Sequence, residues 1–296
     1  MRRRWGRVLL GLVCLGLMAR AQCGKDNRDD KKGGILVTDF TITGTQAISA
    51  TELARMTGEL AGNCFNDDSD EMGERVRALF QDRGYFLPEV KSVKLKPGDP
   101  LASPKPVSME ADVVEGLQFR VGEIDFAGNR AFAPDKLRQQ FPLKTGAVFE
   151  RSKVAAGLQS LRKLYGTSGY LDYIAIPETQ PGSNGIMKLT LTFQEGPQYR
   201  MDKVEFVGQK EMTSRLQVQW KLSPGSVYDS SYIDKYISTN REWLPEGFAR
   251  TDVQVVTDCP KALVQVRFVV DSVENASRSP LKDVPCEDTA DKEKAK

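Results

Sequence analysis

Alternating hydrophobic and polar residues recur three times along the chain, and each time the pattern ends in a glycine. The three segments are Phe40-x-Ile42-x-Gly44, Ile124-x-Phe126-x-Gly128 and Val204-x-Phe206-x-Gly208. Apolar residues two positions apart lie on one face of a β-strand, and a glycine lets the chain leave the strand in a turn. The glycines lie 84 and 80 residues apart. The pattern therefore predicts three repeats of one structural unit.

Two further landmarks recur in the same order. A glycine followed by an aromatic residue occurs at Gly84-Tyr85, Gly169-Tyr170 and Gly247-Phe248. A second alternating strand follows at Met109-x-Ala111-x-Val113, Leu189-x-Leu191-x-Phe193 and Val264-x-Val266-x-Phe268. In the first two copies this strand is followed by Glu115-Gly116 and Glu195-Gly196. The shared order indicates that each repeat has the same succession of elements.

Between the first strand and the Gly-aromatic pair, hydrophobic residues at helical spacing predict two helices in each copy. In the first copy, Ser49 and Glu52 form a capping box, and Leu53, Met56 and Leu60 line one helical face. Each unit is therefore predicted to be β-α-α-β-β. Two helices cover one face of a three-stranded sheet, so the fold class is α+β, with three tandem two-layer modules.

We predict the following domain organisation. A signal peptide occupies residues 1–21, and modules one, two and three occupy residues 34–118, 119–198 and 199–272. A polar tail follows over residues 273–296. Its high charge and few apolar residues are typical of disordered segments.

The N-terminus has the features of a secretory signal. Four arginines within the first seven residues precede a short apolar run, Val8–Met18, and Ala19-Arg20-Ala21 provides a cleavage site. The alternative is an uncleaved anchor, but the run is too short for a membrane span. Cleavage would remove five arginines and change the net charge from +2 to −3. A mildly acidic surface argues against nucleic acid as a partner.

Four cysteines would remain after cleavage, namely Cys23, Cys64, Cys259 and Cys286. Four cysteines allow three pairings, and an oxidising compartment favours disulfides. We favour Cys23–Cys64 and Cys259–Cys286; the alternative is four reduced thiols. The chain has no histidine and no C-x-x-C spacing, so we expect no metal site.

The residues needed for common enzymatic chemistry are missing from the sequence. Without histidine there is no Ser-His or Cys-His pair, and no glycine-rich phosphate-binding loop is present. The acidic residues Asp67, Asp68, Asp70 and Glu71 fit a helix N-terminus better than a calcium loop. We therefore expect a protein that is not an enzyme and has no cofactor.

The second copy resembles the POTRA (polypeptide-transport-associated) domain. The resemblance rests on Gly128-Asn129, Phe132, Gly146-x-x-Phe149, Leu158-x-x-Leu161, Tyr165, Gly169-Tyr170 and Glu195-Gly196. The match is good in the first copy and weaker in the third, and together the three copies cover about residues 34–272. Thr45 and Gln209 replace Asn129 in the other copies, and the third copy lacks the closing Glu-Gly.

The resemblance implies a place in the bacterial envelope. POTRA arrays stand in the periplasm before an outer-membrane barrel that assembles or secretes outer-membrane proteins. Only 24 residues follow the third module, so we expect no barrel within this chain. The resemblance also implies that the second strand of each module lies at a sheet edge.

An edge strand has unpaired main-chain groups, to which an extended peptide can add as a further strand. We expect such edges at Leu171–Ile176 and Thr251–Val256, with binding through Leu171, Tyr173, Ala175, Val253 and Val255. Pro88 indicates a protected edge in the first module. The alternative is that these side chains face the helices and the edges contact only water.

The predicted function is that of a periplasmic polypeptide-binding scaffold in outer-membrane protein assembly or secretion, located in the periplasm or at the periplasmic face of the outer membrane. Its expected partners are other polypeptides, either outer-membrane protein clients or a separate barrel protein through which it would contact the membrane. The alternatives are a rigid docking arm for one barrel partner and a purely structural envelope protein.

Overall fold

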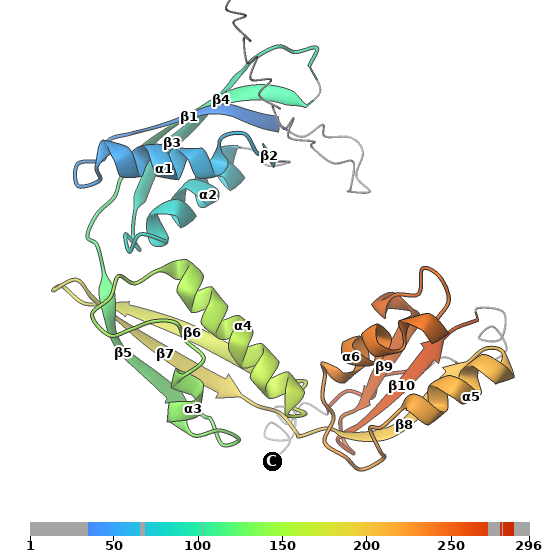
Figure 1. Ribbon diagram of the computed structural model, residues 1–296. Helices are drawn as coiled ribbons and strands as arrows, with labels where there is room; N and C mark the ends of the chain where they lie inside the picture. The colour runs from blue at the N-terminus through green and yellow to red at the C-terminus, as the bar shows by residue number, and fades with distance from the viewer. Residues whose placement is uncertain (1–34, 66–68, 103, 272–278, 280, 287–296) are drawn as a thin grey trace, which may run out of the picture. The chain divides into compact units, whose positions relative to one another are not determined.

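The computed structural model describes residues 35–65, 69–102, 104–271, 279 and 281–286 (Figure 1). The predicted signal peptide therefore lies outside the described residues, as does most of the polar tail. The chain divides into two compact units. Of the described residues, the first unit contains those up to Gln81 and Leu87–Leu117, and the second contains Asp82–Phe86 and those from Gln118 onward.

The first unit has a four-stranded sheet in the order β2-β1-β4-β3. Its elements are β1 (Ile35–Thr43), α1 (Ala50–Leu60), β2 (Cys64–Phe65), α2 (Ser69–Gln81), β3 (Glu89–Pro97) and β4 (Lys105–Val114). Strand β1 runs parallel to β4, and β3 runs antiparallel to β4. Both helices cover the same face of the sheet (Figure 1). The two-residue strand β2 was not predicted, because it is too short to show alternation.

The helix caps of the first unit follow from the sequence. The hydroxyl of Ser49 accepts a hydrogen bond from the main-chain N–H of Glu52 at 3.2 Å. Asp70 and Glu71 lie in the first turn of α2, where acidic side chains stabilise the positive end of the helix dipole. The other two acidic residues of that cluster, Asp67 and Asp68, lie outside the described residues.

The second unit contains two three-stranded sheets. The first has the order β5-β7-β6, with β5 parallel and β6 antiparallel to the central strand. Its elements are β5 (Arg120–Ala127), α3 (Pro134–Arg138), α4 (Arg151–Thr167), β6 (Ile174–Pro181) and β7 (Ile186–Gln194). Its core is formed by Phe149, Leu161, Tyr165, Leu189 and Leu191, all of which are fully buried.

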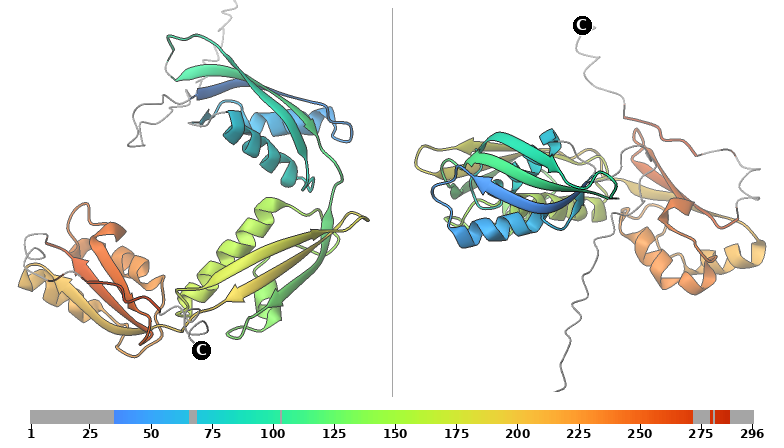
Figure 2. Two further views of the ribbon diagram at one scale, coloured as in Figure 1. Left: turned by 180° about the vertical axis from the view of Figure 1, so that it is seen from behind. Right: turned by 90° about the horizontal axis from the view of Figure 1, so that it is seen from above.

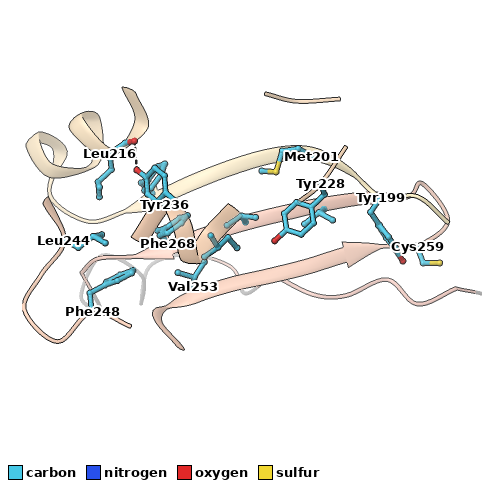
Figure 3. Packing of buried hydrophobic residues seen from close by; sticks show 14 residues of the cluster. Tyr199, Met201, Leu216, Tyr228, Tyr236, Leu244, Phe248, Val253, Cys259 and Phe268 are labelled. Carbon is cyan, nitrogen blue, oxygen red and sulfur yellow. Dashed lines mark hydrogen bonds between the residues drawn. The ribbon is translucent and has the colours of Figure 1, made fainter. Parts of the chain in front are cut away.

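The other sheet has the order β8-β10-β9 with the same strand directions. Its elements are β8 (Arg200–Val207), α5 (Lys210–Gln219), α6 (Tyr232–Thr239), the 3₁₀ helices η1 (Arg241–Trp243) and η2 (Arg250–Asp252), β9 (Val253–Asp258) and β10 (Leu263–Val269). Tyr228, Tyr236 and Phe268 lie in its core (Figure 3). The hydroxyl of Tyr236 donates to the carbonyl of Leu216 at 2.6 Å.

The recurring Gly-aromatic pair has the same role at the start of both sheets of the second unit. The carbonyl of Gly84 accepts the N–H of Phe119, and the carbonyl of Gly169 accepts that of Tyr199, both at 2.8 Å. The two glycines have φ of 83° and 86°. A Cβ atom would lie 2.9 Å from the Phe119 oxygen in the first case and 2.8 Å from the Tyr199 oxygen in the second. Both conditions favour glycine.

The predicted fold class, α+β with three β-α-α-β-β modules, is confirmed (Figure 2). Each of the three sheets lies within one of the predicted modules, whose boundaries remain predictions. Among the described residues, no helix has the length and apolar character needed to cross a membrane.

Candidate polypeptide-binding edges

Strand β6 forms one edge of the second module's sheet, since β7 is its only partner among the described strands. The N–H of Gly182 donates to the carbonyl of Ile186 at 2.9 Å and sets the register of the two strands. In an antiparallel pair, hydrogen-bonded residues alternate with residues whose main-chain groups point away from the partner. The outward-facing residues of β6 are therefore Ala175, Pro177, Thr179 and Pro181.

Both prolines of β6 fall on this outward row. Proline has no N–H, so it is tolerated in a strand where the ladder requires no donor from it. The row has two N–H groups, those of Ala175 and Thr179, and a carbonyl at each of its four positions. No described residue forms a hydrogen bond with these groups. The β6 edge is thus open, but it lacks half of its donors.

The side chains predicted to bind polypeptide at this edge point into the protein. Strand β6 begins at Ile174, so Leu171 and Tyr173 lie before it. Tyr173 and Ala175 pack against the core of the second module, and Leu171 packs against the core of the third. Of these three residues, only Ala175 lies in β6 with its main chain facing outward.

Two exposed hydrophobic side chains beside the edge were missed in the sequence analysis. Ile174 and Ile176 are 50% and 42% exposed and alternate with the inward-facing Ala175. They therefore lie on the sheet face opposite the helices. The same alternation that indicated the strand could have identified them, since one face of a two-layer module has no covering helix.

The carboxylate of Glu195 lies just after β7, beside the start of β6. Glu195 accepts hydrogen bonds from the hydroxyl of Tyr165 at 2.7 Å and from the N–H groups of Arg130 and Ala131. Burial, together with the hydrogen bond to Glu195, raises the pKa of Tyr165. These bonds explain the Glu-Gly that ends the repeat, because the carboxylate satisfies main-chain donors in the turn after β5.

Tyr173 stacks on Tyr165 with 4.1 Å between the ring centroids. Its hydroxyl is buried and has no hydrogen-bond partner among the described residues. Burial raises the pKa of Tyr173 to about 12. The phenol therefore remains neutral at neutral pH, and its role in the structure is to fill the core.

Strand β9 is the corresponding edge of the third module, and Val253, Val255 and Thr257 face outward on it. Val253 has local partners, because its N–H donates to the carbonyl of Arg250 and its carbonyl accepts from the Arg250 guanidinium at 3.1 Å. The Val253 side chain is buried, and that of Val255 is partly buried. The main-chain groups of Val255 have no partner among the described residues.

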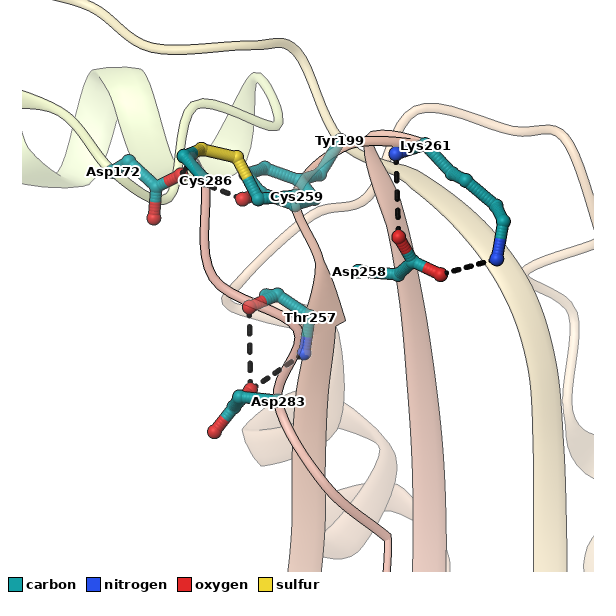
Figure 4. Close-up of a disulfide and its surroundings, with 8 residues drawn as sticks. All are labelled: Asp172, Tyr199, Thr257, Asp258, Cys259, Lys261, Asp283 and Cys286. Carbon is teal, nitrogen blue, oxygen red and sulfur yellow. Dashed lines mark hydrogen bonds and ion pairs between the residues drawn. A yellow bond between two sulfur atoms is a disulfide. The ribbon is translucent and has the colours of Figure 1, made fainter. Parts of the chain in front are cut away.

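A disulfide joins Cys259, just after β9, to Cys286, with their Cα atoms 4.9 Å apart (Figure 4). This is the pairing that the sequence analysis favoured. The Cys286 sulfur also lies 3.8 Å from a carboxylate oxygen of Asp172, which accepts the hydroxyl of Tyr199 at 2.6 Å. The other favoured pairing involves Cys23, which lies outside the described residues.

Comparisons with known proteins show what the second module and the overall fold are similar to. The family model of the POTRA domain, described as the surface antigen variable number repeat, matches residues 119–196. A protein of Treponema pallidum (strain Nichols), named as an outer membrane protein assembly factor, is 26% identical over 196 residues; the match covers 65% of this chain and 23% of that protein. The outer membrane protein assembly factor BamA of Neisseria meningitidis serogroup B is 22% identical over 163 residues, covering 50% and 20%.

A solved structure extends the likeness to the other modules. The POTRA3-5 segment of Haemophilus influenzae BamA superposes with a TM-score of 0.58 at 17% identity, covering 81% of this chain and 98% of that one. This likeness shows the fold. The chain spans about a quarter or less of the length of the two curated relatives. The family match shows that the chain contains a POTRA domain at residues 119–196, and its three modules share the fold of the POTRA3-5 segment of BamA.

Proposed function

We propose that this protein acts in outer-membrane protein assembly by binding extended polypeptide segments as an added strand along β6. The two relatives, which are named as outer membrane protein assembly factors, support a role in this process. The observation that carries the mechanism is the outward row of β6, whose main-chain groups have no partner among the described residues. Such a row pairs with any extended chain, because the hydrogen bonds involve main-chain groups.

The side chains next to the edge favour a particular kind of segment. In an added strand, every second side chain would lie beside the exposed Ile174 and Ile176, and cross-strand neighbours of this kind stabilise pairing when both are apolar. Strands of outer-membrane proteins alternate apolar and polar residues. A segment with that alternation would place apolar side chains against the isoleucines and polar ones on the opposite face.

The wider setting of this function rests on the sequence. The N-terminal signal and the cysteine content support export to the periplasm, where POTRA segments of assembly factors act. We further propose that the chain is a scaffold without enzymatic activity or cofactor, that its partners are polypeptides, and that the predicted module boundaries and the Cys23–Cys64 pairing hold. Contact with the outer membrane would then be made through a partner.

The test uses two substitutions with opposite expected effects. Thr179→Pro removes one of the two outward N–H groups of β6, and Pro177→Ala adds one. With a nine-residue photoreactive peptide of alternating valine and threonine, we expect binding to weaken about tenfold in the first variant and to strengthen severalfold in the second. Thr179→Ala retains the N–H and is the matched control.

Circular dichroism would establish that each variant remains folded. Unchanged peptide capture by folded Thr179→Pro, together with no gain for Pro177→Ala, would contradict binding at β6. Pull-down from bacterial envelopes then separates the alternatives: a wide range of captured polypeptides supports client binding, and a single stoichiometric protein supports a rigid docking arm.

A further inference from the structure

The last described segment of the chain lies along β9 as a short additional strand. We call this segment, Asp283–Cys286, the C-terminal strap. The N–H of Val284 donates to the carbonyl of Thr257 at 2.8 Å, and the carbonyl of Val284 accepts the N–H of Cys259 at 2.9 Å. Together these bonds form a parallel bridge between Asp258 and Val284.

A side chain of the strap completes the pairing. The carboxylate of Asp283 accepts the N–H of Thr257 at 2.7 Å, in the place of a strand carbonyl (Figure 4). From Val255 to Cys259, the outer edge has five main-chain groups: both groups of Val255, both of Thr257 and the N–H of Cys259. The strap occupies three of these five groups, and those of Val255 have no partner among the described residues.

The tail is also attached at two other points. Its carbonyl at Ser279 accepts from the guanidinium of Arg267 at 2.9 Å, and Arg267 is itself held by Glu205 at 2.7 Å. Beyond the bridge, the disulfide joins Cys286 to Cys259 at the end of β9. A covalent link gives the strap a high effective concentration at this edge, so an added strand would compete with it poorly.

The covered edge is the one better suited to pairing. Strand β9 contains no proline, whereas the outward row of β6 contains Pro177 and Pro181. Proteins protect exposed edges by proline or by covering them. These two edge strands of the second unit thus have different protections: β6 lacks donors, and β9 is paired with the C-terminal strap.

We propose that the C-terminal strap guards β9 against strand addition, and that opening the Cys259–Cys286 disulfide makes β9 a second polypeptide-binding edge. This inference rests on the proposed binding of extended segments. An incoming strand could pair with all five outward groups between Val255 and Cys259, whereas the strap pairs with three. Once the covalent link is open, the incoming strand has the larger number of hydrogen bonds.

The opening reaction is an exchange with a dithiol. A thiolate of the dithiol attacks the sulfur of Cys286, which is exposed, and the buried Cys259 leaves as a thiolate. The second thiolate of the dithiol then attacks the mixed disulfide and releases the Cys286 thiolate. Two electrons pass from the dithiol to the protein, the dithiol becomes a disulfide, and both cysteines take up a proton.

The first experiment measures the strap itself. In the oxidised full-length protein, the amide hydrogens of Thr257 and Cys259 are expected to exchange slowly. With dithiothreitol, or in Cys286→Ser, they are expected to exchange at least about tenfold faster. Asp283→Ala is expected to accelerate Thr257 exchange, and Asp283→Asn, which keeps an acceptor oxygen, is the control. Unchanged protection after opening would overturn the proposal.

The second experiment measures binding with the same photoreactive valine–threonine peptide. Cross-links mapped to β9 are expected to rise about tenfold on opening, with those at β6 unchanged. Capture at β6 with no rise at β9 would overturn the guard and leave the proposed function intact. Capture at neither edge in any form would overturn both. If Cys286→Ser proved unstable, the reduced wild-type protein would give the same comparison.

Discussion

The hydroxyl of Tyr165 donates to the carboxylate of Glu195 at 2.7 Å, and this single bond connects α4 with the end of β7. The same carboxylate accepts two main-chain N–H groups from the turn after β5. Tyr173 stacks directly on Tyr165, but its own buried hydroxyl has no partner among the described residues. The two neighbouring tyrosines therefore differ in hydrogen bonding: the hydroxyl of Tyr165 has a partner, and that of Tyr173 has none among the described residues.

This difference predicts opposite effects for the same substitution. Tyr165→Phe leaves a carboxylate without one of its donors and should lower the free energy of unfolding by about 1–2 kcal/mol. Tyr173→Phe removes an unsatisfied buried hydroxyl and should raise it by about 1 kcal/mol. Urea denaturation of both variants measures the two values. Equal losses in both variants would show that the hydroxyl of Tyr173 has a partner in solution.

Glu115 predicts a pH dependence in the first unit. Burial opposes ionisation of this carboxyl, but the N–H groups of Ala47 and Gln46 outweigh it and lower its pKa below the ordinary 4.5. A group whose pKa is lower in the folded state contributes stability that is fully present above the unfolded pKa and is lost as the pH falls through the folded pKa.

The stability of the first unit should therefore decrease from about pH 4.5 downward by more than in Glu115→Gln, whose side chain does not titrate. Hydrogen exchange of the β1 and β4 amides at pH 6, 4.5 and 3.5 measures this loss for the first unit alone. Parallel pH profiles for the wild-type protein and Glu115→Gln would contradict the prediction.

The prolines of β6 predict a change in self-association. Replacing Pro177 and Pro181 by valine restores two outward donors and creates an unprotected edge, along which two copies can pair. We expect the double variant to form dimers or larger species at concentrations where the wild-type protein is monodisperse. Sedimentation velocity measures this, with Pro245→Ala, in the loop after η1, as the control. A monodisperse double variant would show that the prolines do not protect this edge.

Removing the Cys259–Cys286 disulfide is predicted to lower the stability of the third module alone. Cys259 and Cys286 are 27 residues apart, and opening a loop of that length costs about 3.5 kcal/mol in the chain-entropy model. Cys286→Ser should lower the urea midpoint of the third module accordingly. Trp220 and Trp243 both lie in that module, so tryptophan fluorescence of the protein without its signal peptide reports it. Adding reductant to the variant should cause no further change in this signal.

The sequence was sufficient for the fold because the three landmarks recur at one period, and each landmark corresponds to a fixed structural need. Gly84 and Gly169 illustrate this, since both have positive φ and lie too close to a carbonyl for a side chain. Glu195 is another example, because its position after the last strand brings it to the main-chain donors of the turn.

The start of β6 and the residues at its edge were harder to predict from the sequence. The alternation Leu171, Tyr173, Ala175 begins before β6 does, because hydrophobic residues that fill two different cores happen to be two positions apart. Alternation alone does not distinguish such a lead-in from a strand. The C-terminal strap could not be predicted for another reason. It pairs with β9 through a single bridge at Val284, which is too short to show an alternation of apolar and polar residues. The one signal in the sequence was Cys286, whose favoured pairing with Cys259 places this segment beside β9.

If extended segments bind along β6 as proposed, the two prolines on its outward row would also affect how long a bound segment stays. Each missing N–H leaves one carbonyl of the incoming strand without a partner, which weakens the complex mainly by accelerating dissociation. A protein with the proposed function would have to release its bound segment, and a short residence time allows this without an energy source. The number of prolines on this row would thus contribute to the rate of release.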